Sequence, residues 1–311
     1  PPIAIEQPTV KMTFGVNTSP FAGREGKFST SRQLRARLFR ELDTNLGLRV
    51  EDTDAAERFS VSGRGELHLA VLIESMRREG YEFEVSRPEA ITKRVEGVVM
   101  EPVERLTIDV HEDNLGAVTE ALGRRRGEMI EISYGDAGQV RLEYVIPTRG
   151  LIGFRNLFLT LTAGTGLMGS IGIGHRPYAG DFRDQRNGAL TASSPGTALT
   201  YGLAAAQERG TTFIEPGEAV YEGMVVGIQK RPGDMPVNVC REKKQSNVRS
   251  STADIAVRLT PASRLSLEQS LDFLADDELL EVTPKHLRLR KRYLTEVDQA
   301  RARRLLEASR S

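Results

Sequence analysis

Residues 9–85 combine two hydrophobic periodicities in a fixed order, and this order restricts the fold more than any other feature of the sequence. Apolar residues fall at every second position of residues 9–17, which is the spacing of a half-buried strand. In the following segment Leu34, Leu38 and Leu42 are spaced at i, i+4 and i+8, which indicates an amphipathic helix that stops near Gly47. The other elements predicted here are strands at 48–53, 58–62 and 81–85 and a helix at 65–80.

The same order of elements occurs a second time between residues 103 and 174. Segment 150–162 fits a helix or a strand when taken alone, and its place in the repeat favours a helix. The predicted strands are 103–110, 128–134, 139–146 and 167–174, and the predicted helices are 115–122 and 150–162. The order βαββαβ is the split arrangement of ferredoxin-like domains. The sequence therefore predicts an α+β protein with two ferredoxin-like domains in tandem.

After residue 175 the composition changes, and a third domain of mixed α and β structure with a β-rich core is expected. Glycine and small residues are frequent at 176–226, and a polar, turn-rich segment covers 232–252. Helices are predicted at 197–209 and 266–275, and a charged tail from Thr295 is expected to be helical. The expected domain boundaries are thus 1–92, 93–175 and 176–311.

The overall composition is that of an ordinary globular protein. Hydrophobic residues make up 39% and charged residues 28% of the 311 residues, and no apolar run approaches the roughly 20 residues of a membrane span. A single cysteine, Cys240, excludes an intramolecular disulfide framework and fits a reducing compartment. The chain opens on Pro1 and soon enters a strand, so we expect it to be part of a longer protein. Lys and Arg number 43, as do Asp and Glu, but a net charge of zero does not describe how charge is distributed.

Two glycine motifs resemble nucleotide-binding loops, and neither predicts a nucleotide site. Segment 164–169 has the spacing GxGxxG, but a strand-like segment follows it where dinucleotide binding requires a helix. Gly26 and Lys27 resemble the end of a phosphate-binding loop. That loop needs a small residue where this chain has Phe21, and Ser or Thr where it has Phe28.

No metal or nucleophile site is predicted either. The four histidines are far apart, no Cys/His cluster occurs, and His68 lies between two leucines in a helix, which favours a structural role. Cations such as Arg241 could lower the pKa of the Cys240 thiol, but a structural thiol is the favoured interpretation. The acidic run 276–278 could bind Mg²⁺, and a solvated helix end explains it without a metal. The chain by itself is therefore not expected to be an enzyme or to hold a cofactor or metal.

Basic residues gather in two segments of the last third of the chain. One is a polar loop whose Ser, Asn and Gln side chains add donors suited to phosphate and ribose oxygens. The other is a predicted strand at 286–292, in which cations occupy alternate positions. The residues expected to contact RNA are Lys230, Arg231, Arg241, Lys243, Lys244, Asn247, Arg249, Arg288, Arg290, Lys291 and Arg292. A solvated charged face is the alternative interpretation of the same pattern.

Charge is also sorted into blocks along this region. Residues 268–281 contain six acidic side chains and no basic one, whereas 285–304 contain eight Lys or Arg and two acids. The net charge of zero is therefore expected to conceal a basic surface. Because there is no Trp and aromatic residues make up only 6%, contacts with phosphates and 2′-hydroxyls of structured RNA fit better than base stacking.

Several segments resemble one family. Residues 59–91, and above all GRGELHL at 63–69, resemble the third domain of elongation-factor-G-type translational GTPases. Residues 93–175, with GRRRG at 123–127 and PTRGLIG at 147–153, resemble the fifth domain of the same proteins. The stretches that begin at Ser193 and Leu265 closely resemble the C-terminal domain of the TypA/BipA family of ribosome-associated GTPases. The resemblance covers essentially all 311 residues.

This resemblance implies a function that the spacing of residues does not show. Members of the family carry an N-terminal GTPase domain, which uses GTP and Mg²⁺, and a β-barrel domain before the region represented here. They bind the ribosome with the C-terminal domain near the A-site tRNA and large-subunit rRNA, and they are linked to large-subunit assembly and growth under stress. No catalytic residue is carried over, because a P-loop and the guanine-reading motif Asn-Lys-x-Asp are both absent from this sequence.

By position, the loop 241–251 corresponds to the family segment that enters this region of the ribosome, although Gln245 and Ser246 depart from the family pattern. A monomer without membrane attachment is expected, in a bacterial cytoplasm or a plastid stroma. The expected mechanism is electrostatic docking on rRNA and tRNA backbones. A protein-interaction scaffold, or an enzyme with an unrecognised site in the third domain, remain the alternatives.

Overall fold

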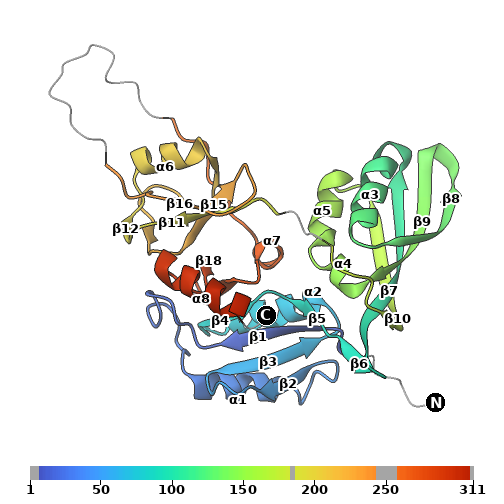
Figure 1. Cartoon of the computed structure of the whole chain (residues 1–311), viewed down its shortest axis with the longest axis horizontal. Coiled ribbons are helices and arrows are strands. Elements are labelled where there is room, and N and C mark those ends of the chain that lie inside the picture. Colours follow the sequence, from blue (N-terminus) through green and yellow to red (C-terminus); the bar gives the residue numbers. More distant parts are fainter. Residues whose placement is uncertain (1–6, 183–185, 243–257, 309–311) are drawn as a thin grey trace, which may run out of the picture.

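The computed structural model describes residues 7–182, 186–242 and 258–308, and its elements are arranged around three apolar cores (Figure 1). The first unit is an antiparallel sheet of order β4-β1-β3-β2. Its elements are β1 (Val10–Gly15), α1 (Ser31–Glu41), β2 (Arg49–Asp52), β3 (Arg58–Gly63), α2 (Glu66–Arg78), β4 (Phe83–Ser86) and β5 (Glu89–Ala90). The order and the pairing are those of a ferredoxin-like domain, as predicted.

Local sequence accounts for these helices. Thr30 caps α1 by accepting a hydrogen bond from the Gln33 backbone N–H, and the Gln33 side chain accepts from the Thr30 N–H in return. The apolar stripes of both helices, which include Leu38 and Leu72, join one core with the inward residues of β1 and β3. Met12 and Phe14 supply the β1 part of that core at every second position.

The second unit repeats this architecture with strand order β10-β7-β9-β8. Its elements are β6 (Lys93–Val95), β7 (Val98–His111), α3 (Glu112–Arg124), β8 (Glu128–Tyr134), η1 (Asp136–Gly138), β9 (Gln139–Pro147), α4 (Thr148–Leu151), α5 (Phe154–Leu161) and β10 (Leu167–Pro177). The ambiguous segment 150–162 is helical, which confirms the prediction made from the repeat. Gly164 and Gly166 lie in the turn from α5 into β10 and Gly169 lies within β10, so no helix follows the glycines and the GxGxxG motif is not a dinucleotide loop.

The third unit contains a four-stranded sheet of order β13-β15-β11-β16 and a small pair, β12-β14. Its elements are β11 (Ala189–Ala192), β12 (Gly196–Thr197), α6 (Thr200–Gln207), β13 (Gly210–Thr212), β14 (Ala219–Val220), β15 (Val225–Gln229), β16 (Met235–Val237), α7 (Leu267–Phe273), β17 (Glu278–Val282), β18 (Leu287–Lys291) and α8 (Glu296–Ala308). The mixed α and β character that we predicted for this region is present.

The C-terminal strands of the third unit do not form a sheet of their own. Strands β17 and β18 extend the sheet of the first unit, which runs β18-β17-β4-β1-β3-β2. In the sequence, Glu82 and Glu84 alternate with apolar residues in a pattern typical of an edge strand with one solvated face. Glu82 is buried under the loop at 17–26, whose Gly23 and Gly26 N–H groups donate to it, and Glu84 accepts from Arg290 of β18. The apolar core of the first unit continues into Leu271 and Leu280.

Candidate nucleic-acid interface

Lys291, at the end of β18, is buried inside a cluster of carboxylates. Its Nζ lies 2.5 Å from Asp234, 2.9 Å from Glu278 and 3.1 Å from Asp277, and the side chain is 1% exposed. Burial alone would lower the pKa of Lys291, but the attraction of Glu278 and its neighbours raises it above its ordinary value. The ammonium group is therefore charged and fully engaged within the chain.

Arg290 is buried against the first unit. Its guanidinium donates to Glu84 at 2.5 Å and to the Thr18 hydroxyl at 2.6 Å, and its side chain is 2% exposed. A third hydrogen bond goes to the Lys291 carbonyl at 3.0 Å. The guanidinium thus ties β18 to the loop and the strand of the first unit.

Arg288 is the third predicted cation of β18 that is paired within the chain, and it contacts two acids, Glu25 and Glu281. It lies 2.6 Å from Glu25 and 3.1 Å from Glu281. Burial alone would raise the pKa of Glu25, but hydrogen bonds from Thr283, His286 and Arg288 lower it to about 2. Glu25 is therefore a carboxylate at physiological pH, and the pair is ionic.

These contacts correct the expectation that Arg288, Arg290 and Lys291 form a phosphate-binding face. In the antiparallel pair of β17 and β18, Glu278 is opposite Lys291 and Glu281 is opposite Arg288. Two acids of the acidic block are therefore paired with two cations of the basic block across neighbouring strands. Of the four cations predicted at 288–292, only Arg292 is exposed.

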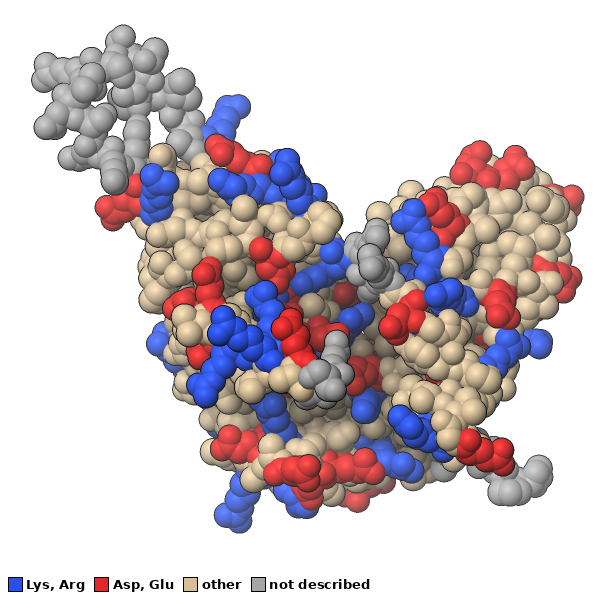
Figure 2. All heavy atoms as spheres, viewed as in Figure 1, with Lys and Arg blue, Asp and Glu red and all other residues tan. Residues whose placement is uncertain are grey.

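The other predicted cations lie at the opposite end of the third unit, around α6. Lys230 and Arg231 are exposed at the end of β15, and the Lys230 N–H donates to the Arg209 carbonyl at 2.9 Å. Arg241 is exposed and its guanidinium lies 5.6 Å from the centre of the Tyr201 ring at the start of α6. Figure 2 shows Lys and Arg gathered on this part of the surface.

Two exposed arginines were not predicted and belong to the same surface. Arg209 follows α6 directly, and Arg258 begins the segment that returns to this helix. The side chain of Gln207, at the end of α6, exchanges two hydrogen bonds with the backbone of Thr260. We call the five exposed cations the α6 rim, and they are Arg209, Lys230, Arg231, Arg241 and Arg258. Neither arginine stands in a basic run, so only the fold could bring them to the others.

The predicted residues Lys243, Lys244, Asn247 and Arg249 lie outside the described residues. The described chain leaves at Glu242 near the first turn of α6 and returns at Arg258 near its last turn. An eight-residue helix is about 12 Å long. The described residues on either side of 243–257 therefore lie near the two ends of one short helix, and rim cations lie at both of these points.

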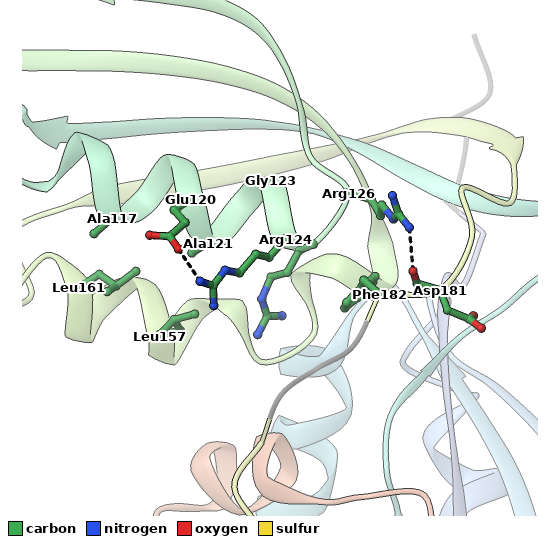
Figure 3. Close-up of a pocket in the computed structure, with 11 residues that line it drawn as sticks. Ala117, Glu120, Ala121, Gly123, Arg124, Arg126, Leu157, Leu161, Asp181 and Phe182 are labelled. Atoms are coloured by element: carbon green, nitrogen blue, oxygen red, sulfur yellow. Dashed lines mark hydrogen bonds and ion pairs between the residues drawn. The ribbon is translucent and has the colours of Figure 1, made fainter. Parts of the chain in front are cut away.

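A second group of arginines lines an open groove of about 820 Å³ between α3 and α5 (Figure 3). Figure 3 shows Arg124 directed at Glu120 and Arg126 at the backbone of Asp181. Arg125 donates to the carbonyl groups of residues 150 and 152. The described residues that line the groove include no Ser, Thr, Cys, His or Lys, and its two carboxylates, Glu120 and Asp181, are hydrogen-bonded to Arg124 and Tyr178.

Other candidate sites carry no chemistry in the described part of the chain. No group of three or more His, Cys, Asp or Glu side chains is placed to hold a metal ion among residues 7–182, 186–242 and 258–308. Burial raises the pKa of the Cys240 thiol. In the acidic run, Asp276 contacts Arg87 and the next two acids contact Lys291. Over the same described ranges, no helix has the length and apolar character needed to cross a membrane.

The three units meet at Glu66, the first residue of α2. Its carboxylate accepts a hydrogen bond of 3.0 Å from the Gly153 N–H of the second unit. Asp272 of α7 hydrogen-bonds Asn156 of α5, which links the third unit to the second. Burial raises the pKa of Glu66 to about 7, with a further contribution from the negative charge of Asp272. The junction therefore holds a carboxyl group that titrates near neutral pH.

Comparison with known proteins identifies the family. The family model described as the TypA/BipA C-terminal domain matches residues 187–296, and the one described as the elongation factor G C-terminus matches residues 98–186. Proteins named large ribosomal subunit assembly factor BipA are similar over nearly the whole chain. The protein of Synechocystis is 50% identical over 94% of this chain and 49% of its own length, and that of Salmonella typhimurium over 98% and 50%.

The protein of that name from Haemophilus influenzae is likewise 50% identical, over 98% of this chain and 50% of its own length. The chain spans about half the length of the curated relatives it matches. The elongation factor G model coincides with the second ferredoxin-like unit, and the TypA/BipA model coincides with most of the third unit. The chain belongs to the TypA/BipA family and corresponds to the C-terminal region of its members.

Proposed function

We propose that this chain is the ribosome-contacting part of a translational GTPase that assists assembly of the large ribosomal subunit in the cytoplasm. We further propose that it docks on rRNA and tRNA backbones through the α6 rim. The names of the relatives support the choice of partner. The observation that supports the α6 rim as the RNA-binding surface is the difference between two basic regions. The β18 cations are neutralised by buried carboxylates, whereas the rim cations are exposed.

The physical basis of this docking is Coulomb attraction with release of counterions from the RNA. Phosphate contacts supply affinity and orientation, and the shape of the folded RNA supplies selectivity. The loop 241–251, which is basic in sequence, would extend the rim because Arg241 and Thr260, on either side of residues 243–257, both contact α6. The ionic network around β18 fixes the third unit on the first, so the rim would keep a constant position relative to the rest of the protein.

The test measures binding of the full-length protein to large ribosomal subunits as a function of salt concentration. One variant replaces Lys230, Arg231 and Arg241 with Ala, and a second replaces the loop cations Lys243, Lys244 and Arg249. A control variant replaces three exposed arginines of the first and second units, Arg32, Arg49 and Arg94.

Each lost phosphate contact lowers the slope of log affinity against log salt by about 0.7 to 0.9. We therefore expect each of the first two variants to lower the slope by about 2, and the control to leave it close to wild type. If the slope and the affinity of both variants equal those of the wild type, the rim is not the RNA contact.

We also propose that GTP binding and hydrolysis belong to residues outside this chain. The sequence contains neither a P-loop nor an Asn-Lys-x-Asp motif, and no pocket described above presents a backbone cradle for phosphates. The 311-residue chain is therefore expected to give no change in fluorescence anisotropy of a labelled GTP analogue. Saturable binding of that analogue would contradict this assignment.

A further inference from the structure

Strand β8 forms an outer edge of the second unit, and every one of its seven residues is exposed. It pairs with β9 on one side only, and no described strand pairs with its other side. An edge strand presents a row of backbone N–H and C=O groups that can pair with another chain. Figure 1 places β8 at the outer margin of the second unit, away from the first and third units.

The two faces of β8 have different chemistry. Met129, Ile132 and Tyr134 are opposite Tyr144, Leu142 and Val140 of β9, so they lie on the face that carries the apolar core. They remain exposed, with Tyr134 at 69% and Ile132 at 38%, and therefore form an apolar strip that continues the core to the edge of the sheet.

On the opposite face Glu131 is placed across from Glu143, and Ser133 is placed across from Arg141. Between residues 128 and 136 there are three carboxylates and no Lys or Arg. Glu128 is paired with Arg176 at the surface, which leaves Glu131 and Asp136 without a cation in the described chain. Figure 2 shows mainly Asp and Glu on the outer rim of this unit.

We propose that β8 is a docking edge for a basic, extended segment of another protein, which joins the sheet as an additional strand. Such a segment, with apolar and basic residues in alternation, would place its apolar side chains beside Ile132 and Tyr134 and its cations beside Glu131. RNA does not fit this edge, because its phosphates would face the carboxylates. A second copy of β8 does not fit either, because antiparallel self-pairing would bring glutamates of the two copies together.

The other edge of the same sheet provides a natural comparison. Strand β10 also exposes apolar residues, among them Ile171 at 68%. It contains no charged residue between 167 and 174 and has three glycines there, so it lacks the carboxylates that select a basic partner. This inference concerns a protein partner and does not depend on RNA docking by the α6 rim.

The experiment uses the 311-residue chain and a labelled peptide of sequence KIKVKIK with capped ends. Binding is measured by fluorescence anisotropy, and the position of the peptide by amide hydrogen exchange with mass spectrometry. The variants are Glu131→Lys and Tyr134→Ser, and the control is Ile171→Thr on β10. All three positions are exposed, and circular dichroism checks that the variants stay folded.

We expect slower exchange at 128–134 on peptide binding and about tenfold weaker binding for Glu131→Lys, because one attraction across the strands becomes a repulsion. Tyr134→Ser should weaken binding about threefold and Ile171→Thr should not change it. Two binding results would overturn the proposal: the acidic peptide EIEVEIE binds as tightly as KIKVKIK, or the Glu131→Lys variant binds KIKVKIK as tightly as the wild type. Two exchange results would also overturn it: the peptide slows amide exchange only outside β8, or a U-rich RNA slows amide exchange in β8. Protection of β8 in the full-length protein without peptide would also overturn it, since the edge would then be covered by the protein itself.

Discussion

The substitution Glu66→Gln should stabilise the chain at neutral pH and remove part of its pH dependence. Glu66 is partly buried where the three units meet, and its pKa is about 7 instead of the ordinary 4.5. A carboxyl group with a raised pKa in the folded state stabilises the fold while it is protonated. That contribution is complete below pH 4.5 and is lost as the pH rises through 7. Glutamine keeps the oxygen that accepts the Gly153 N–H but never becomes charged.

The size of the effect follows from the two pKa values. A shift of one pH unit in a pKa corresponds to about 1.4 kcal/mol. A rise from 4.5 to 7 therefore lowers the free energy of unfolding by about 3 kcal/mol once the carboxyl group is ionised in both the folded and the unfolded state. Between pH 5 and pH 8 the wild type should lose about 2.5 kcal/mol of stability through this group. The Glu66→Gln variant should lose none of that amount.

The assay is urea unfolding of the wild type and of the variant at pH 5 and pH 8, read by circular dichroism. For each protein the free energy of unfolding at pH 8 is subtracted from that at pH 5, and the two results are compared. This comparison cancels the other groups, which titrate over the same range in both proteins. The exposed carboxylate Glu57 serves as the control, and Glu57→Gln should behave like the wild type. An identical loss of stability from pH 5 to pH 8 in the wild type and in Glu66→Gln would refute the reasoning.

The ionic network and the close packing of the third unit lead to three further predictions. Glu25→Gln should lower the free energy of unfolding by about 2 kcal/mol at pH 7, a value reduced by the partial solvation of the side chain. The difference from the wild type should vanish as the pH falls from 4.5, the ordinary pKa, to about 2, the pKa in the folded protein. Lys291→Met removes the cation shared by Asp234, Asp277 and Glu278, of which only Glu278 keeps a second one in the described chain, Arg186, and it should lower the free energy of unfolding in urea by about 3 to 5 kcal/mol; a loss below 1 kcal/mol would show that this cluster does not stabilise the third unit. Gly188→Ala should lower the melting temperature by several degrees, because the new Cβ would lie 1.6 Å from a carbonyl oxygen of the facing turn. Gly169→Ala, which has open space around it, should leave the melting temperature unchanged, and equal effects of the two substitutions would contradict the packing argument.

Most of the fold of residues 9–177 was predictable because the signals that define it are local. The alternation of Met12 and Phe14 and the spacing of Leu34 and Leu38 specify a strand and a helix whatever lies next to them. The helix at 154–161 required the repeat as well, because its own residues fit either periodicity. The junction of β17 with β4 was not predictable, since nothing local to β4 shows that another strand pairs with its edge.

The candidate interface was predictable only in part, and for a related reason. Lys230, Arg231 and Arg241 are exposed as expected, but Arg209 and Arg258 join them only through the contacts of α6. The basic pattern at 288–292 does not indicate whether its side chains are exposed to water or paired with carboxylates. A cation in water and a cation beside a carboxylate differ only in the partner that the fold provides. That partner can be distant in sequence, since 206 residues separate Arg290 from Glu84.

The sequence by itself determined the two ferredoxin-like units, the mixed third unit and the resemblance to one family, because periodicity and motif are properties of neighbouring residues. Only the tertiary structure decided which of the 43 cations are available to a phosphate. Buried charges need a partner of opposite sign, and the fold supplies acidic partners to Arg288, Arg290 and Lys291. These three cations are therefore engaged within the chain, whereas the cations of the α6 rim stay exposed.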